Sequence, residues 1–563
     1  MKIVIVGGVA GGATAAARIR RLDEKAEIVI FERTGFISYA NCGLPYFIGD
    51  VITDPDDLTL QSPAGFFRRF RINAKVHHEV VAITPDSKTV TVKNLETGEF
   101  VEESYDKLIL SPGAKPVMPK LSEAARDKVF TLRTVEDTFK IKEYVNRNHP
   151  KTAVLAGGGF ISLELAENLK ALGINVTVVQ NGNQLMNPFD PEMAAFIHNG
   201  LRRQGVNIVF GHAVEEIKES ENGVDIALSG GCILHADMAA LAIGVTPDTA
   251  LAKDAGIQLG LKGSIVVNDR METSVPDIYA VGDAVQVKNF VTGEGDLIAL
   301  AGPANKQGRI VADNICGIDS RYGGSQGSSV LKIFDLTAAT TGVSEKKARS
   351  LGYETDSVVL SPMSHASYYP GGMVMTMKVV FEKNSYKLLG AQIIGYDGVD
   401  KRIDVLATAI RAGMRATELK ELDLAYAPPY SSAKDPVNIA GFMIDNIARG
   451  VMKQWYIEDA DKLPKDGSVT LLDTRTVGEY QRGHIEGFYN IPVDELRERL
   501  DEVNPGKPVY VICQSGLRSY ISCRILEGNG YTAYNFAGGF RFYQAVMKDR
   551  ALIKRATACG MDN

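Results

Sequence analysis

Short apolar runs that lead into glycine clusters dominate the pattern of the first half of the chain. The run at 2–6 is followed by Gly7-Gly8-Val9-Ala10-Gly11-Gly12, and the run at 152–156 is followed by Gly157-Gly158-Gly159. After each cluster comes a helix-like spacing of apolar residues and then a second apolar run. This order predicts two βαβ units with parallel strands.

The rest of the chain changes pattern twice. Residues 277–283 return to dinucleotide-binding character, so the second βαβ unit is predicted to be inserted into the first domain. From about 325 to 450 the pattern predicts an α+β domain with an amphipathic helix at 399–412, and the polar stretch 459–467 predicts a linker to a small C-terminal α/β domain. The other elements expected in these two domains are strands at 374–381, 388–395, 470–473, 509–513 and 532–535 and helices at 493–500 and 518–528.

Bulk composition limits the class of protein. The 563 residues are too many for one core, and the apolar (45%) and charged (23%) fractions are ordinary for a soluble enzyme. A net charge of −6 argues against a nucleic-acid surface, and no apolar run approaches the roughly 20 residues that span a bilayer. Met1 leads straight into a strand, and the six cysteines lack CxxC or metal-ligand spacing, with Cys523 expected in a core and Cys559 at the surface. We therefore expect a cytoplasmic protein with no metal site, no nucleic-acid partner and no membrane partner.

The first glycine cluster predicts a site for FAD. Gly7 and Gly12 occupy the outer positions of G-x-G-x-x-G, where glycines let the backbone approach a pyrophosphate at a helix N-terminus. Glu32 ends the second strand, where a carboxylate can accept from ribose hydroxyls, and Asp283 is expected near the ribityl phosphate of a flavin. Residues 302–309 are expected to begin a helix whose positive end faces the flavin pyrimidine ring.

The second cluster predicts a nicotinamide nucleotide site. Gly157 and Gly159 are followed by Ser162 in the third place and by Glu164. Gln180 stands where NAD sites usually carry a carboxylate, and no arginine adjoins it to receive a 2′-phosphate. The cofactor is therefore NADH or NADPH, with NADH favoured.

Two cysteines occur in contexts that make a reactive sulfur. Cys42 lies in Ser-Tyr-Ala-Asn-Cys-Gly-Leu-Pro (38–45), and Phe47 five positions later rules out a Cys-x4-Cys pair. A lone thiol must hold its partner as a mixed disulfide, a persulfide or a sulfenate. Cys513 opens the loop Cys-Gln-Ser-Gly-Leu-Arg-Ser (513–519) after an apolar strand. Backbone N–H groups of this loop are expected to form an exposed nest around an anionic persulfide.

These motifs resemble known families. Residues 1 to about 445 resemble the pyridine nucleotide–disulfide oxidoreductase superfamily, most closely its coenzyme A disulfide reductases, and residues from about 469 resemble a rhodanese domain. Together the chain is similar to fused coenzyme A disulfide reductase–rhodanese proteins, a group that includes NADH-dependent persulfide reductases. The resemblance implies an FAD-binding domain at 1–148 and 255–322, an NAD(P)H-binding domain at 149–254, a dimerisation domain at 323–450, and a linker and rhodanese domain at 451–563.

The resemblance also implies an activity. Cys42 would reduce CoA persulfide, polysulfide and CoA disulfide with electrons from NAD(P)H by way of FAD, and Cys513 would handle sulfane sulfur. The enzyme would be a homodimer in which Tyr368 and Tyr426 reach the redox cysteine of the other subunit and supply a proton.

The expected binding residues fall into four groups. For FAD they are Gly7, Gly8, Ala10, Gly11, Gly12, Glu32, Arg33, Ser111, Gly113, Asp283 and Ala299. For NAD(P)H they are Gly157, Gly159, Phe160, Ile161, Glu164, Gln180 and Gly244. For coenzyme A they are Arg18, Arg21, Ser38, Asn41 and Arg71, and in the rhodanese loop they are Gln514, Ser515, Gly516, Leu517, Arg518 and Ser519.

Two other functions stay open on the sequence. A single-cysteine NADH oxidase or peroxidase with an accessory rhodanese domain would form a sulfenic acid, and such relatives carry a histidine in the first glycine loop, where this chain has Val9 and Ala10. A redox-sensing, sulfur-binding scaffold would show no NADH turnover. The physiological sulfur acceptor also stays open, as does whether sulfur passes from Cys513 to Cys42 within one chain or across the dimer.

Overall fold

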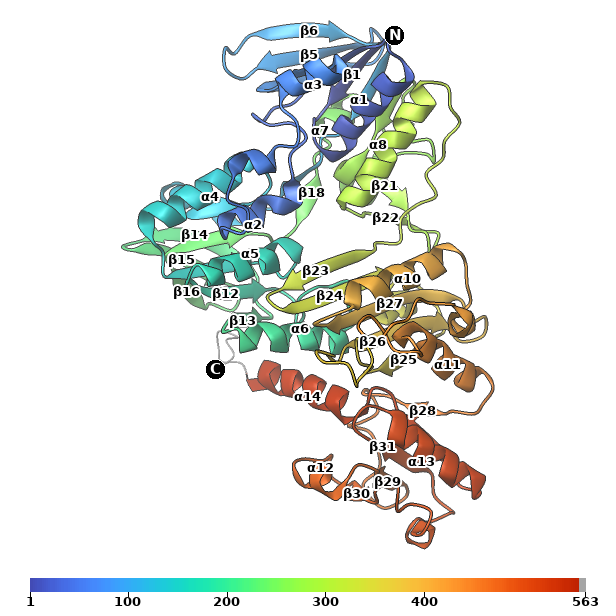
Figure 1. The fold of residues 1–563 in the computed structure, drawn as a ribbon. Coiled ribbons are helices and arrows are strands. Elements are labelled where there is room, and N and C mark those ends of the chain that lie inside the picture. Colours follow the sequence, from blue (N-terminus) through green and yellow to red (C-terminus); the bar gives the residue numbers. More distant parts are fainter. Residues whose placement is uncertain (556–563) are drawn as a thin grey trace. The chain divides into compact units, whose positions relative to one another are not determined.

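The computed structural model describes residues 1–555, which form two compact units (Figure 1). The first unit comprises Met1–Leu185 and Gln204–Gly327, and the second comprises Met186–Arg203 and Ser328–Arg555. Cys559 lies outside the described residues. Between residues 1 and 555 there is no helix with the length and apolar content to cross a membrane.

The first unit contains the expected parallel sheet of the N-terminal domain. Its strands lie in the order β20 (Ile278–Ala280), β7 (Lys107–Leu110), β1 (Lys2–Val6), β2 (Glu27–Phe31) and β3 (Asn73–Lys75). Ile3, Val4 and Ile5 are completely buried, as is typical of a parallel strand covered on both faces. Helices α1 (Ala10–Leu22) and α8 (Ala301–Ile315) pack against each other beside this sheet (Figure 1). Because β20 pairs with β7, the chain returns to this sheet after residue 277.

A second parallel sheet in the same unit follows the second glycine cluster. Its strands lie in the order β10 (Val129–Thr131), β17 (Met238–Leu241), β11 (Thr152–Ala156), β12 (Asn175–Gln180) and β13 (Asn207–Phe210). Helix α5 (Phe160–Ala171) connects β11 to β12, which confirms the second βαβ unit. The other helices of this unit are α2 (Leu44–Ile48), α3 (Pro63–Phe70), α4 (Val135–Asn148) and α7 (Ala250–Asp254).

Smaller sheets complete the first unit. One is antiparallel and consists of β4 (His78–Thr84), β5 (Thr89–Asn94) and β6 (Phe100–Ser104). Another has the order β16 (Ile233–Ala236), β15 (Gly223–Leu228), β14 (Val214–Ser220) and β9 (Lys120–Leu121). The remaining strands are β8 (Ala114–Pro116) with β18 (Val245–Pro247), and β19 (Ile265–Val266) with β21 (Val285–Lys288) and β22 (Gly295–Asp296).

The second unit begins with an antiparallel sheet. Its strands lie in the order β23 (Ser329–Ile333), β24 (Leu336–Gly342), β27 (Leu388–Gly395), β26 (Thr376–Glu382) and β25 (Thr355–Leu360). Helix α10 (Val399–Arg411) packs on β24 and β27, so the expected strands and helix of this α+β domain are confirmed to within two residues. The other helices that accompany this sheet are α6 (Pro191–Arg203), α9 (Glu345–Ser350) and α11 (Pro436–Ala448).

The C-terminal domain is a small parallel α/β fold, as expected. Its strands lie in the order β28 (Gln454–Trp455), β32 (Ala533–Phe536), β31 (Val509–Ile512), β29 (Thr470–Asp473) and β30 (Tyr489–Asn490). Its helices are α12 (Val477–Gln481), α13 (Leu517–Gly528) and α14 (Gly539–Arg555). Cys523 on α13 is buried, as the sequence predicts.

The helix expected at 493–500 is wrong. Successive turns with three-residue spacing replace it, because the N–H of Glu495 donates to Pro492 and that of Glu498 donates to Glu495. A short 3₁₀ helix follows at Leu500–Glu502. This spacing buries both Val493 and Leu496 against the sheet, which satisfies the same apolar pattern without an α-helix.

Candidate active site

The first glycine loop brings distant backbone segments into contact. Gly7 has a φ of +93°, and a Cβ there would lie 2.1 Å from the carbonyl oxygen of Ser111, so only glycine fits. A Cβ on Gly12 would lie 2.0 Å from the carbonyl oxygen of Gly7. Glu32 is buried, and its carboxylate accepts a hydrogen bond of 2.9 Å from the N–H of Gly8. These contacts fix the loop at the start of α1.

Three helices present N-terminal turns suited to a dinucleotide. At their N-cap positions, which are Val9 for α1, Gly159 for α5 and Leu300 for α8, no side-chain capping bond occurs within the described chain. No described atom lies within 4 Å of a Cβ built on Gly159 or Gly302, so there is room beside these turns. N–H groups left for a ligand at a helix N-terminus fit the phosphates of FAD and of a nicotinamide nucleotide.

Other residues expected at the FAD site lie around the first loop. Asp283 sits in a 3₁₀ turn, and its carboxylate is 3.3 Å from the guanidinium of Arg133. The hydroxyl of Ser111 lies 3.0 Å from the Cβ position of Gly11 and 3.7 Å from that of Gly282. The structure therefore brings the turn after β20, the end of β7 and the start of α1 together.

The remaining three predicted FAD contacts have separate local settings. Arg33 forms an ion pair of 2.9 Å with Asp248. Gly113, with a φ of +70°, follows β7, and Ala299 lies directly before α8.

The second glycine loop repeats this geometry. Gly157 has a φ of +103°, and a Cβ there would lie 2.1 Å from the carbonyl oxygen of Ala242. The N–H of Gly158 donates to Oε1 of Gln180 at 3.0 Å, which matches the contact of Gly8 with Glu32. Phe160 and Ile161 form the first turn of α5, and Gly244, with a φ of +131°, follows β17. In the second loop, the neutral amide of Gln180 thus takes the place that the carboxylate of Glu32 has in the first loop.

Cys42 lies on a short 3₁₀ turn, Asn41–Gly43, that leads directly into α2. Its side chain is an exposed free thiol, whereas Phe47 in α2 is buried. Helix α2 packs against α5, and a Cβ on Gly49 would meet the side chain of Asn168. This packing places the cysteine turn next to the helix that follows the second glycine loop.

Two carboxylates raise the pKa of the Cys42 thiol. The protein atoms packed around its sulfur raise the pKa first, and the negative charges of Glu164 and Asp283 raise it further. Glu164 itself has a pKa raised to about 7, because it is largely buried and lies near Glu167. The sulfur predicted to react therefore shares its surroundings with an acid that titrates near neutral pH.

The basic residues expected to bind coenzyme A differ in whether their side chains are already paired within the protein. Arg18 forms an ion pair of 2.8 Å with Asp313, whereas Arg21 is exposed. Arg20, on the same helix, is buried and donates to five backbone carbonyl groups. Arg20 therefore belongs to the framework rather than to a basic surface.

The other three residues expected to bind coenzyme A lie in two places. The N–H of Ser38 donates to Gly8 at 2.8 Å, and Asn41 is exposed beside Cys42, so these two lie near the first loop. Arg71 lies elsewhere, at the end of α3, in the left-handed region and over the ring of Phe67.

The two predicted tyrosines meet in the second unit. Their hydroxyl oxygens lie 2.7 Å apart, although 58 positions separate Tyr368 from Tyr426. Both side chains are exposed. The hydrogen bond between the two hydroxyl groups raises the pKa of Tyr426, so Tyr426 stays protonated at neutral pH.

The C-terminal loop holds Cys513 differently from the expectation. The sulfur is fully buried, so the predicted exposed nest is wrong. The N–H of Gly516 (φ +102°) donates to Sγ at 3.1 Å, and the hydroxyl oxygen of Ser519 lies 3.2 Å from Sγ. The other loop residues differ in exposure: Gln514 is half-buried, Ser515 is exposed, Leu517 is 66% exposed, and Arg518 forms a bidentate pair with Glu479 at 2.7 and 2.8 Å.

Comparison with known proteins identifies the three parts of the chain. Residues 1–308 match the family described as pyridine nucleotide-disulphide oxidoreductase, residues 328–436 match its dimerisation domain, and residues 457–545 match the rhodanese-like domain. The chain belongs to the pyridine nucleotide-disulphide oxidoreductase family. Members of this family use FAD and NAD(P)H, so this oxidoreductase is a flavoprotein enzyme.

Relatives of this oxidoreductase extend the similarity over its whole length. A coenzyme A disulfide reductase of Staphylococcus aureus is 38% identical over 442 residues, which cover 78% of this chain and 99% of that protein. The structure of reduced Bacillus anthracis CoADR-RHD has a TM-score of 0.94 and 47% identity, with 98% of each chain covered. A NAD-dependent persulfide reductase from A. fulgidus has a TM-score of 0.90 and 36% identity, with 96% of this chain and all of that chain covered.

Sequence reasoning missed several polar residues around these loops. Arg133 beside Asp283, Gln307 bonded to the N–H of Gly282 at 2.7 Å, and Asn535 bonded to Ser519 at 2.6 Å come from elements far along the chain. Their neighbours in sequence form no motif, and only the folded sheets bring them to the loops.

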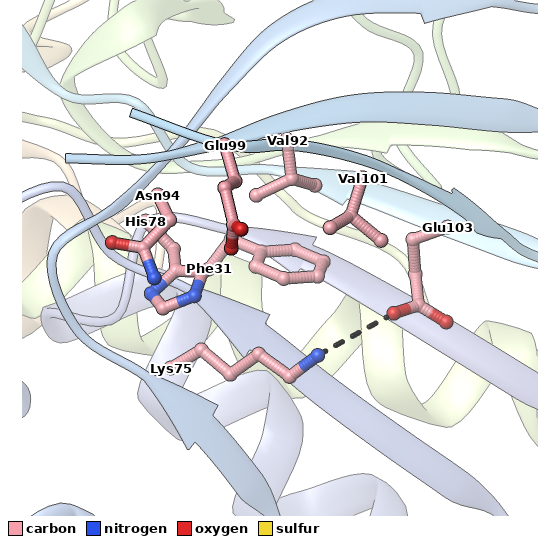
Figure 2. A pocket seen from close by; sticks show the side chains of 8 residues that line it. All are labelled: Phe31, Lys75, His78, Val92, Asn94, Glu99, Val101 and Glu103. Atoms are coloured by element: carbon pink, nitrogen blue, oxygen red, sulfur yellow. Dashed lines mark ion pairs between the residues drawn. The ribbon is translucent and has the colours of Figure 1, made fainter. Parts of the chain in front are cut away.

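The oxidoreductase also has a hollow away from the glycine loops. Figure 2 shows it between the ends of β2 and β3 and the strands β4 to β6. Phe31, Lys75, His78, Val92, Asn94, Glu99, Val101 and Glu103 line it. The ammonium of Lys75 lies 3.6 Å from Glu103 and 5.3 Å from the ring centre of Phe31. None of the predicted cofactor and substrate residues lines this hollow, although Glu32 follows Phe31 directly and shares backbone hydrogen bonds with Lys75 and His78.

Proposed function

We propose that this enzyme uses NAD(P)H and FAD to reduce CoA persulfide, polysulfide and CoA disulfide at Cys42, while its rhodanese domain handles sulfane sulfur. The observation that carries the proposal is the setting of Cys42. It is an exposed thiol at the start of α2, and buried Phe47 occupies the position where a second redox cysteine would stand. A single thiol of this kind must bond covalently to its substrate.

The chain's own residues would hold both nucleotides. Glu32 and the N-terminal turns of α1 and α8 would hold FAD, and Gln180 and the N-terminal turn of α5 would hold the nicotinamide nucleotide. FAD, when bound, would carry electrons from NAD(P)H to the sulfur. Because Gln180 carries no charge and residues 181–189 contain no lysine or arginine, we propose NADH as the preferred donor.

The reaction at Cys42 starts from its thiolate. With CoA disulfide, the thiolate attacks one sulfur, the substrate S–S bond breaks, one CoA leaves as a thiolate, and a mixed disulfide joins Cys42 to the other CoA. With CoA persulfide, the same attack releases hydrosulfide. In both cases two electrons from NAD(P)H then break the mixed disulfide and restore the Cys42 thiolate, and the CoA that was joined to Cys42 leaves with a proton.

Tyr368 and Tyr426 are proposed as the donors of that proton. Their hydroxyl groups are 2.7 Å apart and exposed, so a leaving thiolate can reach them. The match to a dimerisation domain supports a homodimer in which each pair serves the other subunit. Cellular NADH and CoA as reactants favour a cytoplasmic location.

Coenzyme A would lie along the surface between α1 and the cysteine turn. Arg21 and the outer face of Arg18 would hold its phosphates, with Ser38 and Asn41 beside the pantetheine arm. Arg71 at the end of α3 would contribute charge. We also propose an FAD-binding domain at 1–148 and 255–322, an NAD(P)H-binding domain at 149–254, a dimerisation domain at 323–450, and a linker and rhodanese domain at 451–563.

One assay compares this function with its main alternative. Under anaerobic conditions, purified enzyme should oxidise NADH with CoA disulfide, CoA persulfide and polysulfide, and the persulfide and polysulfide should each yield stoichiometric hydrogen sulfide. NADH oxidation that occurs only with oxygen or peroxide would instead identify an NADH oxidase or peroxidase. No turnover with any acceptor would leave a sulfur-binding scaffold.

A further inference from the structure

Three possible acceptors lie within reach of the single hydroxyl hydrogen of Ser519, beside Cys513. The oxygen of Ser519 lies 3.2 Å from Sγ of Cys513, 3.1 Å from the carbonyl oxygen of Gly516 and 2.6 Å from Oδ1 of Asn535. A serine hydroxyl can donate one hydrogen bond at a time. The shortest of the three contacts is the one to Asn535, so the hydrogen lies there when Cys513 is a neutral thiol.

The orientation of the Asn535 amide follows from its other contact. Its nitrogen faces Sδ of Met452 at 3.8 Å, and a thioether is an acceptor only. The amide oxygen must therefore point to Ser519. The side chain of Asn535 is 1% exposed on β32, so water does not compete for this oxygen.

We propose that Asn535 is a positioning residue that competes with the Cys513 sulfur for the Ser519 hydrogen and so sets the balance between thiol and thiolate at Cys513. While Asn535 holds the hydrogen, the thiol of Cys513 can donate its own S–H to Ser519. A thiolate would then keep the N–H of Gly516 but lack the hydroxyl donor. This proposal rests on the function proposed for Cys513. It adds that Asn535 disfavours the thiolate form of Cys513.

Other ionisable groups also act on this sulfur, and the variants described below leave them unchanged. On α13 Arg518 is paired with Glu479, and burial raises the pKa of Cys523 far above neutral. At the end of β29 Arg475 is paired with Asp473. At the start of α14, the backbone N–H of Arg541 donates to the carbonyl oxygen of Gln514.

The test measures the pH at which Cys513 reacts with iodoacetamide in the full-length FAD-bound enzyme, by quantifying its peptide with mass spectrometry. Asn535→Leu removes the competing acceptor without adding charge. It should free the hydroxyl for the thiolate and raise reactivity at pH 7 roughly tenfold, the size of one hydrogen bond to a charged group. Asn535→Asp should do the opposite and move the midpoint to higher pH.

Ser519→Ala provides the decisive background. In the Ser519→Ala protein, Asn535→Leu should not change the reactivity of Cys513. In the same protein, Asn535→Asp should change that reactivity only through the charge of the new carboxylate. The exposed control Asn529→Leu should leave the midpoint unchanged. The proposal is overturned if Asn535→Leu fails to raise the reactivity of Cys513, or raises it equally without Ser519, and this holds even if Asn535→Asp does not fold. Because the readout is alkylation, a failed sulfur-transfer function would show separately, as full polysulfide reduction by Cys513→Ser.

Discussion

At the residue scale, burial raises the pKa of Cys42 most, and the charges of Glu164 and Asp283 raise it further. Glu164 has a pKa raised to about 7, so above neutral pH it is a carboxylate that raises the pKa of Cys42, and below neutral pH this influence disappears. Glu164→Gln removes the charge at every pH. The pKa of Cys42 should then fall.

Alkylation of the Cys42 peptide against pH, in the FAD-bound enzyme without NADH, measures this shift. Glu167→Gln is the matched control one turn along α5, because Glu167 acts on the pKa of Glu164 and not directly on Cys42. It should not lower the pKa of Cys42. An unchanged Cys42 titration in Glu164→Gln would mean that Glu164 has no electrostatic role at the thiol.

The tyrosine pair makes a second prediction at this scale. Tyr368→Phe and Tyr426→Phe each break the 2.7 Å bond, and the double variant removes both acids. Turnover with CoA disulfide should fall in each single variant and by about 10²-fold or more in the double variant. Tyr369→Phe alters an exposed neighbour and should keep the normal kcat. A double variant with unchanged kcat would exclude the pair as proton donors.

At the element scale, one buried lysine joins three segments of the second unit. Lys378 on β26 lies 2.9 Å from Asp190 and 2.8 Å from Glu345, and it also pairs with Glu192 at the start of α6. Although burial opposes ionisation, the charge of Lys378 holds the pKa values of Asp190 and Glu345 below their usual range. Their contribution to stability is therefore present at neutral pH and is lost as the pH falls through those low values.

Lys378→Met should leave three buried carboxylates without their counter-ion and destabilise the second unit by about 3–5 kcal/mol at pH 7. Without the lysine these acids have raised pKa values, so the variant should regain stability as the pH is lowered toward 5. Urea unfolding followed by the fluorescence of Trp455, the one tryptophan of the chain, reports on this unit. Exposed Lys383→Met should change stability by less than about 0.5 kcal/mol, and an equally stable Lys378→Met would contradict the role of the cluster.

Local pattern was enough to predict some elements and not others. The glycine loops could be read from the sequence because φ values of +93° and +103°, and Cβ contacts near 2 Å, allow no other residue at Gly7 and Gly157. The helix expected at 493–500 failed because the apolar spacing of Val493 and Leu496 also suits a series of three-residue turns. The short strand β30 has two residues, too few for any period.

Side-chain surroundings were harder to predict than elements. Arg18, Arg20 and Arg21 look alike in sequence, but only the fold decides that Arg20 is buried under backbone carbonyl groups. The burial of Cys513 depends on Ser519 and the fold of the rhodanese domain rather than on the loop sequence alone. The contact between Tyr368 and Tyr426 also arises from tertiary structure.

At the scale of the whole molecule, the chain joins two thiols with different access. Cys42 is exposed in the first unit, whereas Cys513 is buried in a rhodanese domain of the second unit. Under the proposed function, small CoA substrates would react at Cys42 without the second thiol. Sulfur from a polymeric donor would pass first through Cys513 as a persulfide, and this part of the proposal rests on the match to a rhodanese-like domain rather than on exposure.

The measurement that tests this account most directly is anaerobic NADH oxidation by Cys42→Ser and Cys513→Ser, each with CoA disulfide, CoA persulfide and polysulfide. Cys42→Ser should bind FAD normally and lose turnover with all three substrates. Cys513→Ser should keep its activity with the two CoA substrates and lose most of its activity with polysulfide. Substantial turnover in Cys42→Ser, or an equal effect of Cys513→Ser on all three substrates, would contradict the proposed division of labour.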